Sequence, residues 1–136
     1  MKATELALMI GDLVNLSPSN TPVQNYVKIH AIDYDYEVSK DYVCDIVFLS
    51  TGAIQHNYPM SVLKPILLTP EILKKNGFKD GQYFAELYIQ GWHVISDAHN
   101  LCMECERGWH MNIPCRCVHE LQHAFNLVGI NKEITL

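Results

Sequence analysis

The chain has 136 residues, 49% of them hydrophobic and 18% charged, with a formal net charge of −5 and a pI of about 5.7. This length fits one domain, or two very small halves that share a core, with enough apolar side chains to fold alone. The acidic balance argues against nucleic-acid binding, which favours basic patches, and no stretch approaches the roughly 20 apolar residues of a membrane-spanning helix.

The cellular compartment is indicated by the cysteines and by the N-terminus. Five cysteines, an odd number, fit reduced thiols better than a secreted disulfide framework. The apolar patch near the N-terminus contains Glu5 and is too short for the apolar region of a signal peptide. We therefore expect a cytoplasmic protein.

Short apolar runs that alternate with polar residues or are rich in β-branched side chains fill the first half of the chain. They predict strands over residues 10–16, 26–38, 42–50, 54–58 and 62–68, with a short helix over 3–9, a loop over 17–22 and a turn at Thr51-Gly52. Short strands joined by tight turns predict a small curled sheet or an SH3-like barrel.

The second half opens with a compact helix signature. Thr69 can cap the helix, Pro70 suits its first position, and Gly77 can end it. Two hairpins are expected around Gln90-Gly91 and Arg107-Gly108.

A last helix is predicted over residues 116–128, with Gly129 as its stop. Its apolar stripe is formed by Val118, Leu121, Ala124, Phe125 and Val128. The fold class is therefore α+β: an SH3-like N-terminal half over residues 1–68, followed by an α+β half over 69–136, either as two halves or as one compact domain.

Three segments, in order along the chain, carry a resemblance. They are Leu-Met-Ile-Gly-Asp-Leu-Val at residues 8–14, Pro-Ile-Leu-Leu-Thr-Pro-Glu-Ile-Leu at 65–73 with Gly77-Phe78, and Val-His-Glu-Leu-Gln at 118–122 with Leu127-Val128-Gly129. With these segments the chain resembles a family of small uncharacterised proteins from Bacteroidales genomes and their phages. The family has no established activity, so the resemblance implies an organisation and a source rather than a reaction.

The last helix contains His119, Glu120 and His123 in the order H-E-x-x-H, the pattern of zinc proteases. In such enzymes the two histidines bind zinc and the glutamate activates the metal-bound water. The apolar stripe leaves both histidines on the opposite face, where we expect them to meet solvent or a groove. Gly129 stands where the extended pattern has a third histidine, and the resembling family usually lacks the glutamate and the second histidine. A third ligand would have to come from one of five upstream residues: Asp97, His99, His110, Cys115 and Cys117.

Four cysteines form a second candidate for zinc. Cys102 and Cys105 have the C-x-x-C spacing of a zinc knuckle, and Cys115 and Cys117 follow. On one strand, Cys102 and Cys105 would point to opposite faces, and a knuckle needs an earlier turn than Glu106-Arg107-Gly108. Buried free thiols are the alternative explanation.

Two further groups of residues are candidate sites. Asp33, Asp35 and Glu37 alternate on one strand face and could hold a cation, although a solvated strand face is the commoner explanation. Five tyrosines could form a binding surface or belong to the core: Tyr26, Tyr34, Tyr36, Tyr42 and Tyr58. Four other aromatic residues are expected mainly in the core of the second half: Tyr83, Phe84, Trp92 and Trp109.

The sequence therefore favours a non-enzymatic binding or accessory protein of a phage or mobile element, with a protein as its partner and no membrane or cofactor. The alternatives are a zinc hydrolase through His119, Glu120 and His123, and a structural zinc protein through the four cysteines.

Overall fold

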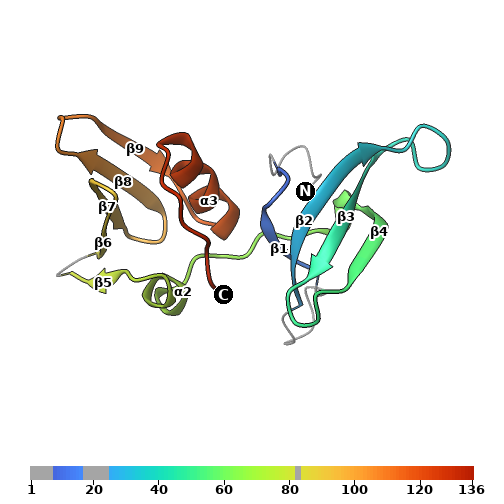
Figure 1. The fold of residues 1–136 in the computed structure, drawn as a ribbon, viewed down its shortest axis with the longest axis horizontal. Coiled ribbons are helices and arrows are strands. Elements are labelled where there is room, and N and C mark those ends of the chain that lie inside the picture. Colours follow the sequence, from blue (N-terminus) through green and yellow to red (C-terminus); the bar gives the residue numbers. More distant parts are fainter. Residues whose placement is uncertain (1–7, 17–24, 82–83) are drawn as a thin grey trace. The chain divides into compact units, whose positions relative to one another are not determined.

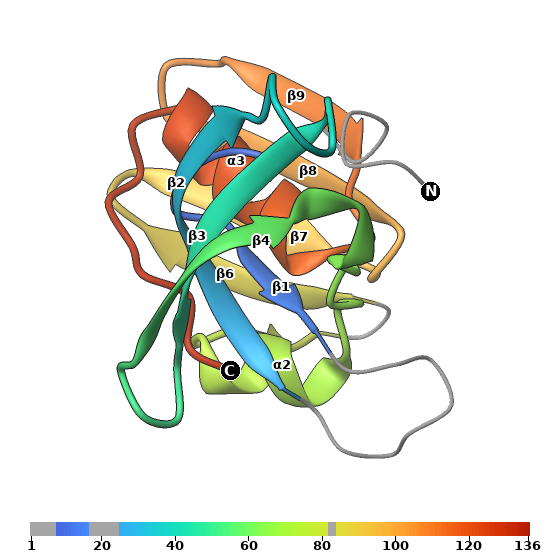
Figure 2. The same ribbon diagram turned by 90° about the vertical axis from the view of Figure 1, so that its right-hand side faces the viewer.

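The computed structural model describes residues 8–16, 25–81 and 84–136, and the chain divides into two compact units, Met1–Ile66 and Leu67–Leu136 (Figures 1 and 2). Each unit contains one antiparallel sheet, and helices are few. The predicted loop over 17–22, most of the predicted helix over 3–9, and Tyr83 lie outside the described residues.

The first unit is a meander of four antiparallel strands in the order β1-β2-β3-β4. They are β1 (Leu13–Asn15), β2 (Tyr26–Tyr34), β3 (Tyr42–Phe48) and β4 (Ile54–Pro59), and a short 3₁₀ helix, η1 (Met60–Val62), follows them. The strand predicted over residues 26–38 ends early, because residues 35–40 form the turn that leads into β3.

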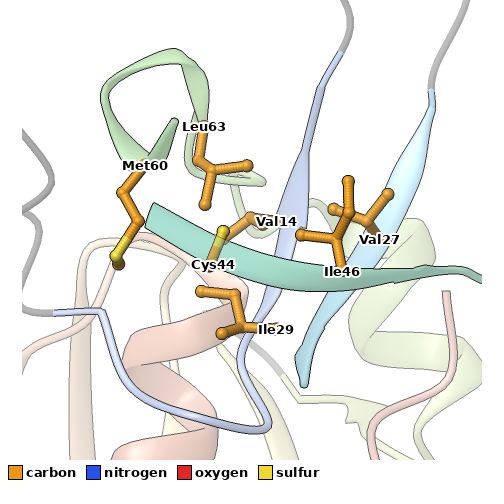
Figure 3. Close-up of a cluster of buried hydrophobic side chains, with 7 residues drawn as sticks. All are labelled: Val14, Val27, Ile29, Cys44, Ile46, Met60 and Leu63. Atoms are coloured by element: carbon orange, nitrogen blue, oxygen red, sulfur yellow. The ribbon is translucent and has the colours of Figure 1, made fainter. Parts of the chain in front are cut away.

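The core of the first unit follows from the two-residue period of its strands (Figure 3). Val27 and Ile29 on β2 face the same interior as Cys44 and Ile46 on β3, and each of the four is at most 2% exposed. Three residues from neighbouring segments complete the cluster: Val14, Met60 and Leu63. Burial raises the pKa of the Cys44 thiol to about 11, so this cysteine serves as a small apolar side chain.

After η1 the chain returns to the free edge of β1. The Asn15 and Lys64 backbones exchange two hydrogen bonds of 2.9 Å, each N–H donating to the other residue's carbonyl. The strand predicted over residues 62–68 is reduced to two isolated bridges, because Pro65 between them has no N–H with which to extend a ladder. Lys64 pairs with Asn15, and Leu67, in the second unit, pairs with Cys117. A mostly β N-terminal half is therefore confirmed, but the described part of the unit contains no closed barrel.

The second unit contains a five-stranded antiparallel meander, with one helix before it and one after it in the sequence (Figure 1). The strands are β5 (Lys79–Asp80), β6 (Ala85–Ile89), β7 (Trp92–Ser96), β8 (Asn100–Cys105) and β9 (His110–Pro114), and the helices are α2 (Pro70–Lys75) and α3 (Val118–Leu127). Both predicted hairpins are confirmed. Gln90 and Gly91 have φ values of 48° and 82°, as a two-residue type I′ turn requires.

Helix α2 begins as the sequence predicts, because the Thr69 hydroxyl accepts a hydrogen bond of 3.2 Å from the Ile72 N–H. On α3 four of the five stripe residues are buried, with Leu121 and Phe125 at 0% and 1% exposure, and the fifth, Val128, is half-buried. The assignment of Phe84 and Trp109 to the core is wrong: they are 47% and 72% exposed. Trp109 lies in the β8–β9 turn, beyond the last cross-strand pair.

Two side-chain amides hold the C-terminal tail, residues 128–136, within the second unit. The buried Asn76 amide donates to the Thr135 carbonyl (2.8 Å) and accepts from the Thr135 N–H (2.7 Å). Its nitrogen also donates to the Ile72 carbonyl at 2.7 Å. At the β6–β7 turn, Gln90 makes the same two-way pair with the backbone of Asn131, with both distances 3.1 Å. These amides replace the partners that a neighbouring strand would supply.

The burial of Phe125 leads to a first prediction. Phe125→Ala should lower the free energy of unfolding by roughly 3–5 kcal/mol, because an enclosed aromatic ring leaves a cavity. Leu127→Ala, on the same helix at 75% exposure, is the matched control and should change it by less than about 0.5 kcal/mol. Urea unfolding of both variants measures the difference. An equal loss of unfolding free energy in the two variants would show that α3 does not pack through its apolar stripe.

A second prediction concerns the tail. Asn76→Ala should cost roughly 1–3 kcal/mol, because the part-buried N–H and carbonyl of Thr135 lose their partner, and should speed amide exchange at Thr135. Gln90→Ala removes the equivalent pair at an exposed position and should have a smaller effect on stability. Unchanged exchange at Thr135 in Asn76→Ala would contradict the role of this amide.

Candidate functional site

The clearest concentration of exposed aromatic side chains described in the first unit lies on the connection between β2 and β3. We call residues 33–42 the tyrosine hairpin. Tyr34 and Tyr42 are paired across the two strands, and their rings meet edge to face with centroids 5.2 Å apart and planes at 83°. Tyr36 packs on the same Tyr34 ring with centroids 4.7 Å apart and an interplanar angle of 60°. Tyr34 is therefore the centre of a three-ring cluster.

The turn that carries this cluster is organised by the Asp35 carboxylate. Its oxygens accept hydrogen bonds from the N–H groups of Glu37 (3.1 Å), Val38 (3.2 Å) and Ser39 (2.9 Å), and from the Ser39 hydroxyl (2.9 Å). The backbone N–H of Ser39, followed by that of Val38 and the Ser39 hydroxyl, lowers the pKa of Asp35 to about 2. A short acidic side chain thus supplies the partners of an exposed turn.

A second contact fixes the central ring. The Tyr34 hydroxyl donates a hydrogen bond of 2.7 Å to the Lys40 carbonyl. Lys40 itself has a φ of 51°, in the left-handed region, where it reverses the chain towards β3. The ring is therefore held at its hydroxyl and by its contacts with the neighbouring rings.

The cluster remains accessible to a partner. Tyr36 is 78% and Tyr42 is 42% exposed. Together with Tyr34 and Lys40 they line an open hollow of about 390 Å³. The hairpin contains four carboxylates, Asp33, Asp35, Glu37 and Asp41, against the single lysine. Exposed aromatic rings in an acidic setting make this hairpin the candidate binding surface.

The five tyrosines singled out from the sequence divide into two groups. Tyr34, Tyr36 and Tyr42 come together, whereas Tyr58 packs against the core cluster and Tyr26 is half-buried at the start of β2. The acidic residues of the proposed cation site are also engaged locally. Asp35 holds the turn, and an Asp33 oxygen accepts from the Tyr34 N–H at 2.8 Å.

In the H-E-x-x-H segment, Glu120 caps its own helix. Its Oε1 accepts hydrogen bonds from the N–H groups of Arg116 (3.1 Å) and Cys117 (3.2 Å), the second as part of a capping box. The two imidazole rings lie edge to face with centroids 5.7 Å apart. The expectation that both histidines meet solvent or a groove is wrong for His119, which is buried at 3% exposure, while His123 is half-buried. The first turn of α3 is buried over a wider arc than the apolar stripe alone.

The four clustered cysteines occupy different local environments. Cys102 lies within β8, opposite Asn112, and Cys105 ends that strand. Cys115 is fully buried, and Cys117 is the N-cap residue of α3. Desolvation, followed by the nearby Glu120 charge, raises the pKa of both Cys115 and Cys117 to about 12. Metal binding would have to remove these protons.

The upstream residues considered as third zinc ligands are placed on the β7–β8 turn and on β9. Asp97 Oδ1 accepts from the N–H groups of His99 (2.9 Å) and Asn100 (2.6 Å), and these bonds, that of Asn100 first, lower its pKa. His110 faces Glu104 across the β8–β9 ladder. Within residues 8–16, 25–81 and 84–136, no three His, Cys, Asp or Glu side chains gather as a metal site.

Comparison of the chain with protein-family models, with curated proteins and with solved structures gives no match. None of the helices in the described ranges is long and apolar enough to span a membrane. Function must therefore be inferred from the geometry of the chain itself.

Sequence reasoning missed the grouping of the tyrosine hairpin and the part played by Lys40. The usable signal was the segment Asp-Tyr-Asp-Tyr-Glu-Val-Ser-Lys-Asp-Tyr, in which an aspartate lies four residues before a serine and tyrosines stand on both sides. Recognising it as a turn, rather than as a bend in a long strand, places Tyr34 opposite Tyr42.

The Asp35 turn predicts a local response to acid. Because the folded pKa lies below the ordinary value of 3.8, at about 2, the stabilisation is present above pH 3.8 and is lost as the pH falls through 2. The Ser39 amide resonance should shift with that midpoint, and amides of residues 36–39 should then exchange faster. Asp35→Asn should abolish the transition, and a midpoint near 3.8 in the wild-type protein would contradict the hydrogen-bonded geometry.

Proposed function

We propose that this protein is a non-enzymatic binding module that holds a protein partner on the tyrosine hairpin. In this proposal it serves in the cytoplasm as an accessory protein of a phage or mobile element, as the family resemblance implies. The observation that carries the proposal is the exposed three-ring cluster on a turn that is held by hydrogen bonds. Aromatic side chains of this kind provide large contact areas at low entropic cost, and they are enriched in protein-binding surfaces.

The arrangement of the first unit supports a place for this site on an SH3-like scaffold. Four antiparallel strands are followed by the 3₁₀ helix η1, and the chain then pairs with β1 through Asn15 and Lys64. In this proposal the bridge is a minimal fifth strand, and the β2–β3 hairpin extends beyond the sheet. A rigid scaffold that presents a loop is a common way to build a binding site.

The choice of a protein partner rests on charge. A strand of nucleic acid would bring phosphates towards Asp33, Glu37 and Asp41, with only Lys40 to attract them in the hairpin. Nucleic-acid sites instead combine stacking aromatics with a positively charged groove. A polypeptide that lacks acidic side chains has no such penalty.

The enzyme alternative has weaker support. In a zinc hydrolase Glu120 must act on a metal-bound water, but here its Oε1 accepts from Arg116 and Cys117. Zinc in the cysteine cluster would have to displace protons from thiols with raised pKa values. Neither alternative has a gathered set of three ligands among the described residues.

The proposal is tested by affinity capture from the native host. The wild-type protein should retain a defined protein, and the double variant Tyr36→Ser/Tyr42→Ser should lose it. Tyr88→Ser removes a tyrosine that is 74% exposed in the second unit and is the matched control, so it should retain the partner. Capture that is unaffected in the double variant would refute the site. Substrate turnover that disappears in Glu120→Gln would instead establish the hydrolase.

A further inference from the structure

We infer that the tyrosine hairpin recognises a positively charged side chain, arginine or lysine, presented by an extended segment of the partner. This inference rests on the proposed function and specifies the chemistry of its ligand. It is carried by three features of the same ten residues: the ring faces, the surrounding charge and the fixed geometry of the turn.

The ring geometry suits a cation. The face of a tyrosine ring is the negative end of its quadrupole, and a guanidinium or ammonium group placed over it is attracted. In the hairpin the three rings meet edge to face rather than stacked, at 60° and 83°. Tyr36 and Tyr42 keep much of their surface open to the hollow that they line. A cationic side chain that enters this hollow meets more than one ring.

The charge of the hairpin also favours a cationic ligand. Its four carboxylates and one lysine give a formal charge of −3, more than half of the chain's −5. The Asp35 carboxylate is largely occupied by the turn, but Glu37 and Asp41 are exposed. Such a field raises the encounter rate and favours positively charged partners over negative ones.

The site is also formed before the ligand arrives. The bond from the Tyr34 hydroxyl to the Lys40 carbonyl and the four bonds to Asp35 hold the turn without a partner. A prearranged site avoids much of the entropy cost of ordering side chains on binding. The hairpin can therefore bind a short segment with few contacts.

Lys40 provides an internal test, because it is one of the four residues that line the hollow and its positive charge repels a cationic ligand. Only its carbonyl is needed to hold Tyr34. Lys40→Asn keeps that carbonyl and tolerates the positive φ, so this variant should bind a cationic peptide more tightly. The inference thus predicts that substitution of Lys40 raises the affinity for a cationic peptide, whereas substitution of Glu37 or Tyr36 lowers it.

The experiment is a titration of the ¹⁵N-labelled full chain with three capped Gly-Ser-Pro nonapeptides that differ only at three positions, which carry arginine, citrulline or glutamate. Citrulline keeps the shape of arginine and removes its charge. The arginine peptide should shift the amides of residues 34–42, and citrulline should weaken binding roughly threefold to thirtyfold, the range of a cation–π contact. The glutamate peptide should not bind.

The variants measure each contribution with the arginine peptide. Glu37→Gln should weaken binding and Lys40→Asn should strengthen it, each by about two- to fivefold, as expected for exposed charges. Tyr36→Leu, which keeps an apolar side chain, should weaken binding by at least the citrulline factor. Glu133→Gln makes the same charge change at an exposed position in the second unit and should leave the affinity unchanged.

The outcomes separate this inference from the proposed function. Equal binding of the arginine and citrulline peptides at the hairpin would overturn the cation inference and leave the binding module standing. The cation inference would also be overturned if no peptide bound while capture of the host protein still depended on Tyr36 and Tyr42. The binding module would again stand. A single-stranded oligothymidine that bound the hairpin more tightly than the arginine peptide would overturn both proposals.

Discussion

The hydrogen bonds to Asp35 are the constraint on which the candidate site depends. One carboxylate satisfies three consecutive backbone N–H groups and a hydroxyl, and so fixes the direction in which the chain leaves β2 and enters β3. Without that turn Tyr36 would have no defined place beside Tyr34. The carboxylate is exposed, so its importance lies in the geometry that it specifies rather than in a large contribution to global stability.

The second unit uses polar side chains in the same structural manner. Asn76 and Gln90 pair with backbone groups of the tail, and Glu120 caps the helix that bears the H-E-x-x-H motif. A glutamate three residues after an N-cap commonly caps its own helix. A glutamate at the same position of an H-E-x-x-H motif acts as the general base in a zinc protease. The spacing alone does not distinguish these roles, whereas the hydrogen-bond partners of Oε1 do.

Much of the fold could be predicted from local patterns. The strands of both sheets apart from β5, the helix after Thr69, the turn at Gln90-Gly91 and most of the stripe of α3 follow from periodicity and turn chemistry, which act over a few residues. The prediction of a continuous strand over 62–68 was wrong because Pro65 interrupts the ladder. The prediction that Trp109 is buried was wrong because burial depends on which distant segment packs against a side chain. The same limit applies to the site. The tyrosines were recognisable as a group, but the separation of Tyr34, Tyr36 and Tyr42 from Tyr26 and Tyr58 depends on strand register.

The most direct test of the central claim is the mobility of the tyrosine hairpin in the isolated protein. ¹⁵N relaxation of the full chain at neutral pH should give order parameters for residues 36–40 close to the value of about 0.85 of a rigid backbone. Tyr34→Phe, which removes only the hydroxyl donor to the Lys40 carbonyl, should lower them. Order parameters below about 0.6 in the wild-type protein would show that the turn is flexible and would contradict a preformed binding site.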